Sequence, residues 1–225
     1  MKINVIILAR GGSKGLPNKN ILPFGDKPLV AQSITQSIES KLVGGVYVSS
    51  DSVEILDISQ RWGAIPINRP KNLSEDTSTS ESALQHALKV MVDTDVVVFL
   101  QPTSPLRTSD DIDNAITTLL NGNYDSLFSS VELEDICIWG DNGGSFNSLN
   151  FDYKNRKRRQ EIKKQYLENG SIYVFKPQVL LDNNNRLGGN IGTYVMDNWK
   201  QFEIDNKDDF ELCEFYLKNK LWKKD

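Results

Sequence analysis

Three cations lie close together near the start of the chain, in a loop that is rich in glycine. The loop follows the apolar run at residues 3–8 and carries Arg10, Lys14 and Lys19. Glycines let a backbone approach a ligand closely, and the loop holds Gly11, Gly12 and Gly15. Backbone N–H groups and clustered cations together suit a polyphosphate. We therefore expect this loop to hold a nucleoside triphosphate.

Other interpretations of this loop are weaker. Residues 11–15 satisfy the G-x-S-x-G pattern of a hydrolase nucleophile elbow, with Ser13 as the nucleophile. An elbow requires a helix directly after the turn, whereas Pro17 and Asn18 prolong the loop. The only histidine, His86, falls in a helical pattern, and the Walker A spacing is absent. The remaining alternative is a strand–loop connection without a ligand.

A second polar loop follows the strongest strand signal of the chain. Residues 101–107 come directly after the buried run Asp95–Leu100 and include two prolines, which fix the backbone. The polar side chains of this loop are Gln101, Thr103, Ser104 and Arg107. A rigid polar loop at the end of a strand is suited to a ligand with many hydroxyl groups. The alternative is a plain strand-to-helix connection.

The segment Ser74–Glu81 carries five hydroxyl side chains just before a helical pattern. One of them, Thr79 or Ser80, is sufficient to cap that helix. The others, including Ser78, are available for contacts to a base or a ribose. We therefore expect this segment to face the bound nucleotide.

Near the end of the chain, Glu203 and Asp205 lie two residues apart. We expect a last strand at about Gln201–Ile204, which would point both carboxylates to one face. Paired carboxylates suit Mg²⁺, which also takes phosphate oxygens and waters as ligands. Asp111 and Asp113 have the same spacing, but they open a helical pattern and complement its dipole.

Composition restricts the class of protein. The chain has 225 residues, of which 39% are hydrophobic and 25% charged, as is usual for one globular domain. Its formal charge of −4 gives no support to nucleic-acid binding. Cys137 and Cys213 are far apart, which argues against a disulfide framework. Without a signal-peptide pattern or a long apolar run, we expect a cytoplasmic protein that does not bind membranes.

Strand-like and helical patterns alternate through the first 130 residues, which predicts an α/β fold with a parallel sheet and helices on both faces. Strands are expected at residues 3–9, 46–51, 64–67, 95–100 and 126–131, and helices at 53–62, 80–92 and 109–120. In such sheets, ligands bind beyond the carboxyl ends of the strands. The polar loops above fall at these ends.

The alternation breaks from Glu132 onward. We expect a small appendage at about 132–196, which includes a strand at 171–175, and then a closing helix at 208–221. The dense basic run Lys154–Arg159 lies in this region. It is either a solvated surface, a wall for an anionic substrate or, less in keeping with the charge, a nucleic-acid contact.

These motifs together resemble the CMP-sialic acid synthetases, or acylneuraminate cytidylyltransferases. The resemblance covers nearly the whole chain, in order, through Ala9–Asn20, Arg69-Pro70, Asp76–Ser80, Leu100–Arg107, Asn169–Tyr173 and Glu203–Asp205. The segment Gly188–Met196 is more similar to relatives that activate bacterial nonulosonates such as legionaminic or pseudaminic acid. The resemblance implies a Rossmann-like nucleotidyltransferase fold across residues 1–225, and it implies that the appendage is the dimerisation region.

The resemblance also implies roles for individual residues. Arg10, Lys14 and Lys19 would hold the triphosphate and, with Asp205, serve catalysis. The nucleotide-binding set would be Arg10, Gly12, Ser13, Lys19, Asn20, Arg69, Ser78 and Ser80. The acidic sugar would meet Gln101, Thr103, Ser104, Arg107, Arg159 and Asn169. Asp205 and Glu203 would bind Mg²⁺, although family members often have an aspartate where this chain has Glu203.

The implied reaction transfers CMP from CTP to the anomeric hydroxyl of a sialic-acid-like 2-keto sugar acid and releases pyrophosphate. The expected state is a homodimer. One alternative is a cytidylyltransferase for 3-deoxy-manno-octulosonate or its amino derivative. An alternative of another class is a non-catalytic nucleotide-binding regulator, although such a protein is expected to lose cations or carboxylates that this chain keeps.

Overall fold

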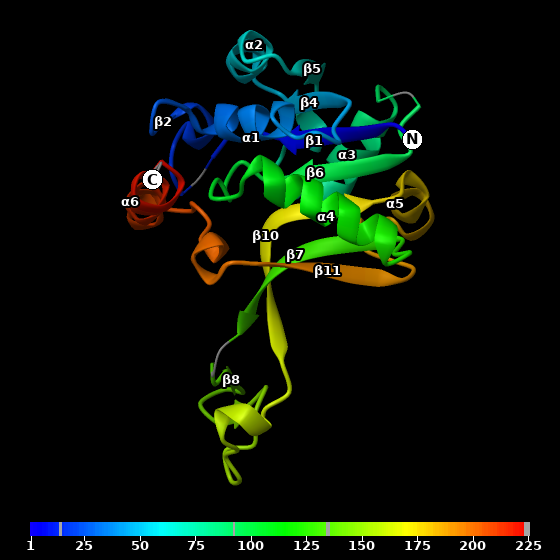
Figure 1. Ribbon diagram of the computed structural model, residues 1–225. Helices are drawn as coiled ribbons and strands as arrows, with labels where there is room; N and C mark the ends of the chain where they lie inside the picture. The colour runs from blue at the N-terminus through cyan, green and yellow to red at the C-terminus, as the bar shows by residue number, and fades with distance from the viewer. Residues whose placement is uncertain (14, 92, 134–135, 223–225) are drawn as a thin grey trace.

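The computed structural model describes residues 1–13, 15–91, 93–133 and 136–222, with the side chain of Arg159 left out. A seven-stranded sheet in the order β11-β7-β10-β6-β1-β4-β5 forms its centre (Figure 1). The strands are β1 (Ile3–Leu8), β4 (Gly45–Ser50), β5 (Ile65–Asn68), β6 (Val96–Leu100), β7 (Ser126–Leu133), β10 (Gln165–Phe175) and β11 (Ile191–Met196). All neighbours pair in parallel except β10, which runs antiparallel to β6 and β7. The predicted α/β class is confirmed.

Both faces of the sheet are buried, as the uninterrupted apolar runs predicted. Alternate residues of β1 and β6 enter two separate hydrophobic clusters. The first cluster is closed by α1 (Leu29–Ile38), α2 (Val53–Arg61) and α4 (Ser109–Asn121). The second is closed by α3 (Ser80–Leu88) and α5 (Pro177–Asn183). Figure 1 shows α1 and α4 in front of the sheet and α3 behind it.

The helix α4 begins at a complete capping box. Thr108 accepts from the amide of Asp111, and the Asp111 carboxylate accepts from the amide of Thr108 at 2.7 Å. Asp113 accepts from the hydroxyl of Ser40 and from two amides that follow it. The prediction that this acidic pair opens a helix is therefore correct.

The end of the chain packs against its beginning. The closing helix is α6 (Lys207–Tyr216), which continues as the π-helical turn η5 (Leu217–Leu221). A third hydrophobic cluster joins Cys213 and Leu217 to Phe24 and Leu29. Phe24 belongs to the short strand β2 (Pro23–Phe24), which pairs with β3 (Lys27–Pro28). The expected closing helix at 208–221 is confirmed.

The expected strand at about Gln201–Ile204 is wrong. Asn198–Gln201 forms the 3₁₀ helix η4, and the chain then runs to α6 without joining the sheet. The amide of Ile204 donates to the carbonyl of Thr103 at 2.7 Å, so the segment is attached to a loop. Phe202 stacks on Tyr216 of α6, which also draws the segment away from the sheet.

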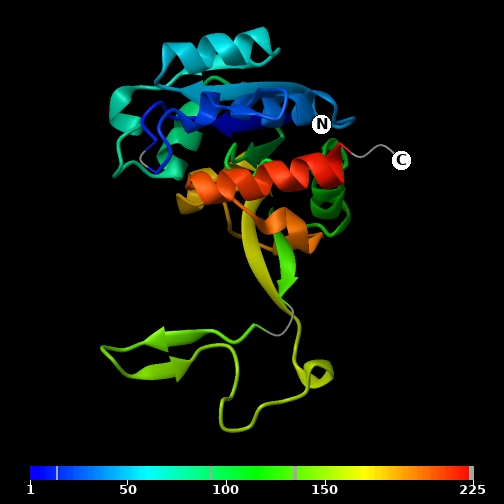
Figure 2. The same ribbon diagram turned by 90° about the vertical axis from the view of Figure 1, so that its left-hand side faces the viewer.

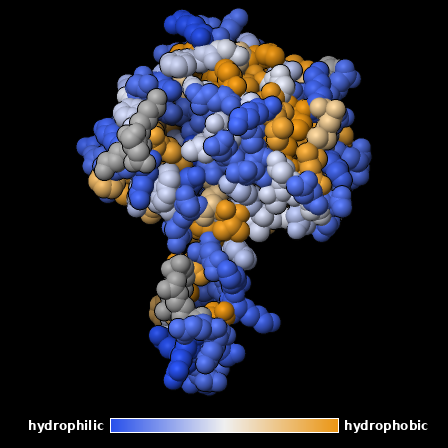
Figure 3. Space-filling model, viewed as in Figure 1, coloured by the Kyte–Doolittle hydropathy of each residue, from blue (hydrophilic) through white to orange (hydrophobic). Residues whose placement is uncertain are grey.

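A narrow arm projects from the body of the molecule, and it is shorter than the appendage expected at 132–196. The arm comprises residues 136–164, and it contains the hairpin of β8 (Trp139–Asp141) and β9 (Phe146–Ser148) and the turn η3 (Arg159–Glu161). Figures 2 and 3 show it standing away from the body. Residues 165–175 and 191–196 instead join the main sheet, because Ile172 and its apolar neighbours are buried there.

The hairpin is tied to the start of β10 by side chains. Asn150 accepts from the amide of Ile138 at 2.8 Å and donates to Gln165 at the same distance. Gln165 donates to the carbonyl of Asn150 at 3.0 Å. These reciprocal amide contacts connect the hairpin to β10, although no described residue of the arm is fully buried. Across the described ranges, no helix combines the length and the hydropathy needed to cross a bilayer.

The two cysteines are expected to differ in reactivity. Cys213 is fully buried, and burial raises the pKa of its thiol to about 12, so little thiolate forms at neutral pH. Cys137 is exposed on the arm. We expect a disulfide reagent at pH 8 to modify Cys137 rapidly in the native protein and Cys213 only after unfolding. Spectroscopic thiol counting on the wild-type chain and on Cys137→Ser checks this. Rapid modification of native Cys137→Ser would contradict the packing of α6.

Candidate functional site

A cleft of about 500 Å³ opens at the carboxyl ends of β1, β5 and β6. It lies where ligands bind in parallel α/β sheets. Its walls come from four stretches that are far apart in the sequence. They contribute Arg10, Ser13, Gly15, Lys19 and Asn20 from the first loop, Arg69 and residues 73–76 and 78–80 from the second, Gln101, Pro102 and Thr103 from the third, and Asp205.

The cationic loop is held against the cleft by its own polar groups. The amide of Gly11 donates to Asp51 at 3.0 Å, and the side chain of Asn20 donates to the carbonyl of Arg10 at 2.9 Å. Ser13 is followed by a loop that reaches η1 (Lys19–Ile21), so no helix directly follows this turn. A hydrolase elbow is therefore excluded. Lys14 lies outside the described residues.

Lys19 connects the first loop to the end of the chain. Its Nζ donates to the carbonyl of Ile204 at 2.5 Å and to Asp205 Oδ1 at 3.1 Å. Only 12% of the Lys19 side chain is exposed, against 74% for Asp205. Gly15 lies so close to this segment that a Cβ there would stand 2.3 Å from the carbonyl oxygen of Asp205. The cations and the carboxylate are thus brought together although they are distant in sequence.

Arg10 reaches across the cleft to the hydroxyl-rich segment. Its Nη1 lies 3.1 Å from Asp76 Oδ1, and both side chains are partly exposed. The hydroxyl of Ser78 donates to the carbonyl of Asn72 and accepts from the amide of Glu75. Thr79 caps α3, as one of the two residues predicted for that role. Ser78 therefore holds the shape of the segment, and Ser80 lies in the wall of the cleft.

Arg69 lines the cleft and carries buried hydrogen-bond donors that have no partner among the described residues. The residue is 6% exposed, and its Nε and Nη2 atoms find no partner among the described residues. Burial lowers the pKa of the guanidinium, and neighbouring Asp51 partly counters that effect. Buried donors without partners are costly in a folded protein. Both nitrogens are closed to solvent, so a ligand acceptor would reach them only after the side chain turned toward the cleft.

The loop after β6 divides into residues that face the cleft and residues that do not. Gln101 and Thr103 line the cleft, and Gln101 Nε2 donates to the carbonyl of Gly170 at 2.8 Å. Ser104 and Arg107 are each 1% exposed. Arg107 donates to the carbonyls of Gln101 and Ser104 and to the hydroxyl of Ser33. Its burial lowers the pKa of the guanidinium to about 9.

Three residues predicted to bind an acidic sugar do not face the cleft, so the prediction is wrong for them. Arg107 and Ser104 lie beneath the loop, and the Nη atoms of Arg107 and the hydroxyl of Ser104 bond to protein partners, although Arg107 Nε has none among the described residues. Asn169 is 3% exposed and accepts from the hydroxyl of Ser129 at 2.6 Å, so it supports β10 in the interior. The fourth, Arg159, begins η3 in the arm, and its side chain lies outside the described part of the structure.

The two carboxylates of the acidic segment differ in surroundings. Asp205 lines the cleft, whereas Glu203 turns inward and accepts from the hydroxyl of Ser104 at 3.2 Å. Burial raises the pKa of Glu203, although the bond from Ser104 partly counters it. Where the chain is described, no three histidine, cysteine or acidic side chains gather to hold a metal ion unaided. A metal here would need ligand oxygens as well.

Gly170 provides the space in which Glu203 and Gln101 meet. Its φ of +64° is a conformation that side chains other than glycine rarely adopt. A Cβ at this position would stand 1.8 Å from Glu203 Oε1 and 2.8 Å from Gln101 Nε2. In the sequence, Gly170 stands out only as part of the motif Asn169–Tyr173. Its role depends on contacts that the fold creates between residues distant in sequence.

The chain was compared with known proteins. A family model described as cytidylyltransferase matches residues 4–223. The chain is 34% identical to an N-acylneuraminate cytidylyltransferase of Escherichia coli, over 94% of this chain but only 51% of that protein. It is 30% identical to a pseudaminic acid cytidylyltransferase of Campylobacter jejuni, over 97% of both chains. It thus spans about half of the first relative and nearly all of the second.

Among solved structures, the chain is similar to a CMP:2-keto-3-deoxy-manno-octonic acid synthetase complexed with CTP. The TM-score is 0.71, and the alignment covers 97% of this chain and 99% of the other. Sequence identity is 16%, so this likeness supports the fold and nothing finer. The nucleotidyltransferase fold predicted from the motifs is confirmed.

The close approach at Gly170 yields a stability test with a matched control. Both Gly170 and Gly143 have positive φ, but a Cβ at Gly143 meets nothing within 4 Å. We expect Gly143→Ala to cost about 1 kcal/mol of unfolding free energy through backbone strain alone. Gly170→Ala should cost roughly 1–3 kcal/mol more, because it displaces the half-buried Glu203 carboxylate from Ser104. Urea unfolding measures both, and equal losses would show that Glu203 moves freely.

Proposed function

Because this chain belongs to the cytidylyltransferase family, we propose that it transfers CMP from CTP to the anomeric hydroxyl of a nonulosonate and releases pyrophosphate. The observation that carries the proposal is the cleft itself. It places Arg10, Lys19 and Asp205 around one space at the carboxyl edge of the sheet. Cations and a carboxylate are the groups that phosphoryl-group transfer requires.

The nucleotide fits the side of the cleft formed by the first two loops. Arg10 and Lys19, with the neighbouring Lys14 in sequence, would neutralise the triphosphate. The main chain at Gly12 and Ser13 would approach the phosphates. Arg69, which lines the cleft, would turn its unpaired donors to acceptors of the cytosine or ribose. Asn20, Ser78 and Ser80 complete this proposed nucleotide site.

The acceptor sugar fits the side formed by the loop after β6. Gln101 and Thr103 line this wall, and Gln101 is oriented by its bond to the carbonyl of Gly170. The two relatives described above are named for an N-acylneuraminate and for pseudaminic acid, which are acidic nine-carbon sugars. We therefore propose this substrate class. Arg159 of the arm remains the proposed partner of the sugar carboxylate.

The chemistry of the site suits a divalent cation. Asp205 offers an exposed carboxylate beside the proposed triphosphate position, and Glu203 lies two residues away. Mg²⁺ needs only one or two protein carboxylates when phosphates and waters supply the other ligands. When bound, it would neutralise charge on the phosphates. We propose that Asp205 would bind Mg²⁺ directly. Glu203 would bind it either directly, as a second ligand, or through a water molecule.

Positioning and charge neutralisation are the main contributions that this chain would make to the reaction. Gln101 would orient the acceptor hydroxyl toward the α-phosphate, in line with the departing pyrophosphate. Lys19 would stabilise charge on the phosphates while its bond to Ile204 keeps its Nζ in place. His86, the only histidine of the sequence, lies on α3 and is absent from the cleft wall, so we assign it no role as a base.

Fewer observations support the alternative substrate and the alternative function. The structural neighbour is named for 2-keto-3-deoxy-manno-octonic acid, but that likeness concerns the fold alone. A regulator that merely binds nucleotides would not need the pairing of Lys19 with Asp205 beside the cleft. We also propose that the enzyme works in the cytoplasm, where CTP is made.

We further propose that the protein is a homodimer formed through the arm. The expected appendage at 132–196 included the apolar residues 172–175, but these are buried in the main sheet and are not available for an interface. The arm supplies the reason for the proposal. A two-stranded hairpin is marginal alone, and this one exposes apolar side chains. They are Ile136, Ile138, Trp139, Phe146, Leu149, Tyr153 and Ile162.

Substrate use tests the proposed function directly. Pyrophosphate release is measured with CTP, UTP or ATP and a panel of acceptors comprising an N-acylneuraminate, pseudaminic acid, N,N′-diacetyllegionaminic acid and 3-deoxy-manno-octulosonate. We expect turnover with CTP and at least one nine-carbon acceptor. Preference for 3-deoxy-manno-octulosonate would transfer the assignment to the alternative substrate. Comparable rates with UTP would contradict the proposed contacts of Asn20 and Arg69 to cytosine.

The two carboxylates are expected to respond unequally to loss of charge. Asp205→Asn should lower kcat by about 100-fold and raise the Mg²⁺ concentration needed for half-maximal activity, because one ionic ligand at the phosphates is lost. Glu203→Gln should have a smaller effect, because Glu203 turns away from the cleft. Mg²⁺ titration at saturating CTP and sugar compares them. Full wild-type activity in excess chelator would eliminate the metal site.

If the protein dimerises through the arm, a charged substitution in the hairpin should prevent dimer formation. Trp139→Glu should convert the dimer to a monomer, since it places a charge among the exposed apolar side chains of the hairpin. Trp62→Glu is the matched control, because Trp62 is similarly exposed, at 37% against 42%, but lies on the body. Sedimentation at micromolar concentration measures both. A monomeric wild-type chain, or equal effects of the two substitutions, would refute assembly through the arm.

A further inference from the structure

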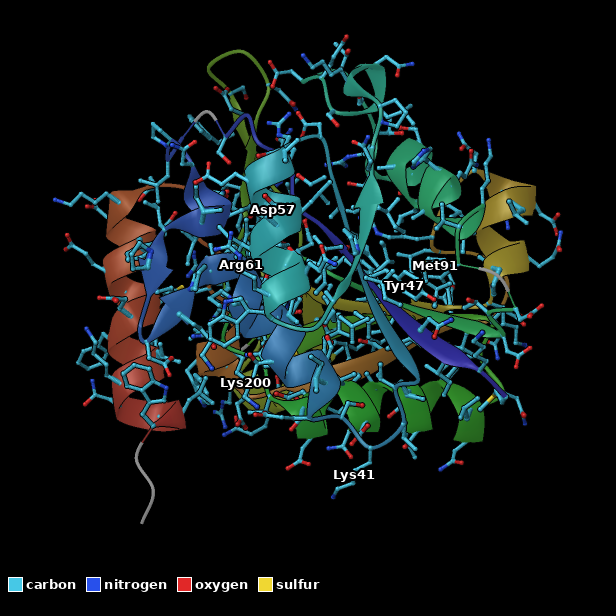
Figure 4. All side chains as sticks on the ribbon, turned by 90° about the horizontal axis from the view of Figure 1, so that it is seen from above. Lys41, Tyr47, Asp57, Arg61, Met91 and Lys200 are labelled. Carbon is cyan, nitrogen blue, oxygen red and sulfur yellow. The ribbon has the colours of Figure 1, made fainter. Side chains whose placement is uncertain are left out.

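A buried ion pair anchors the turn that precedes the acidic segment. Lys200 of η4 places its Nζ 2.7 Å from Asp111 Oδ2 and 2.9 Å from Asp111 Oδ1. The side chains are 9% and 6% exposed. Figure 4, viewed from above, shows Lys200 within the body of the molecule, whereas Lys41 lies at its edge. A lysine this deep in the structure is unusual unless it is paired.

Helix capping does not account for this pair. The carboxylate of Asp111 already accepts from the amide of Thr108 at 2.7 Å and from its hydroxyl at 2.9 Å. It also accepts from the hydroxyl of Tyr194 at 3.1 Å. The cap of α4 is therefore complete without Lys200. A buried ion pair contributes little net stability, because both charges lose their hydration. The better explanation for the pair of Lys200 and Asp111 is that it fixes the position of the main chain around Lys200.

The location of the Lys200–Asp111 pair indicates which part of the main chain it holds in place. Lys200 is held at one end of a short segment, and Ile204 is held at the other by its bond to the carbonyl of Thr103. Both anchors belong to one continuous stretch, from Thr103 to Asp111, that leads from the cleft into α4. Glu203 lies between the anchored residues and Asp205 follows directly. The carbonyl of Lys200 also meets the side-chain amide of Asn169 at 3.5 Å.

We propose that Lys200 is a positioning residue, whose pairing with Asp111 sets the place of Glu203 and Asp205 at the cleft. It acts through the main chain of residues 200–205 and touches neither substrate. The inference rests on the proposed role of the two carboxylates in binding a divalent cation. Partners that orient metal ligands typically change metal affinity or activity by 10–100-fold when they are removed.

The first test uses Lys200→Met in the full chain, since methionine keeps much of the apolar stem and removes the charge. The Mg²⁺ concentration for half-maximal pyrophosphate release should rise about tenfold or more. The KM for CTP should rise less than the Mg²⁺ requirement, because Arg10 and Arg69 belong to other loops, although Lys19 bonds to Ile204 and Asp205. Lys200→Arg, which keeps the charge, should recover much of the loss.

The second test does not depend on activity. Hydrogen exchange of the Ile204 amide, followed by NMR in the absence of substrates, should be about tenfold faster in Lys200→Met, because the segment is released at one end. The matched control is Lys176→Met. Lys176 pairs with Asp125 at 2.7 Å just before β7, at the opposite edge of the sheet from the cleft. It should change neither Mg²⁺ dependence nor exchange at Ile204.

A double-variant cycle identifies Asp111 as the partner. Lys200→Met, Asp111→Asn and the double variant should show similar shifts in Mg²⁺ dependence, because either change breaks the same pair. Additive shifts would show that the two residues act separately. If Lys200→Met lowers only the unfolding transition, with wild-type Mg²⁺ dependence and exchange, positioning is overturned. If the wild-type enzyme needs no divalent cation, the metal proposal fails, while exchange at Ile204 still decides the positioning role.

Discussion

The main chain of Ile204 is the point on which the geometry of the cleft depends. Its amide is bound by the loop after β6 and its carbonyl by the ammonium of Lys19, so two walls of the cleft meet at one peptide segment. These bonds hold an irregular segment as firmly as a strand position would. They replace the sheet pairing that the sequence pattern predicted, and they allow Glu203 and Asp205 to face different surroundings.

Much of the fold was predictable because buried strands have an unmistakable pattern. The apolar runs that became β1 and β6 lack polar alternation, and each ends at a loop with proline and a cationic side chain. The parallel arrangement then brings such loops to one edge. For this reason Arg10, Lys19 and Gln101 could be placed at one edge of the sheet from the sequence pattern, whereas Arg69 was assigned to the site only through the family resemblance.

The direction in which a polar side chain points was not predictable in the same way. Arg107 and Asn169 resemble ligand contacts in sequence, yet both are buried supports, because the chain folds back over them. The extent of the arm was misjudged since β10 pairs antiparallel with β6, which the alternation of strands and helices does not indicate. The helix α1 was missed because it begins after Pro28 without a side-chain cap. The pairing of Lys200 with Asp111 links residues 89 positions apart and has no local signature.

The separation of Lys19 from Asp205 has a consequence for biosynthesis. These partners are 186 residues apart, so a chain emerging from the ribosome carries its cationic loop long before the opposing carboxylate exists. Contacts of such high sequence separation form late and slow the folding of a domain. The pairing of Lys19 with Asp205 therefore forms only after residue 205 has been made. The helix α6, whose Cys213 packs with Phe24 and Leu29, follows later still.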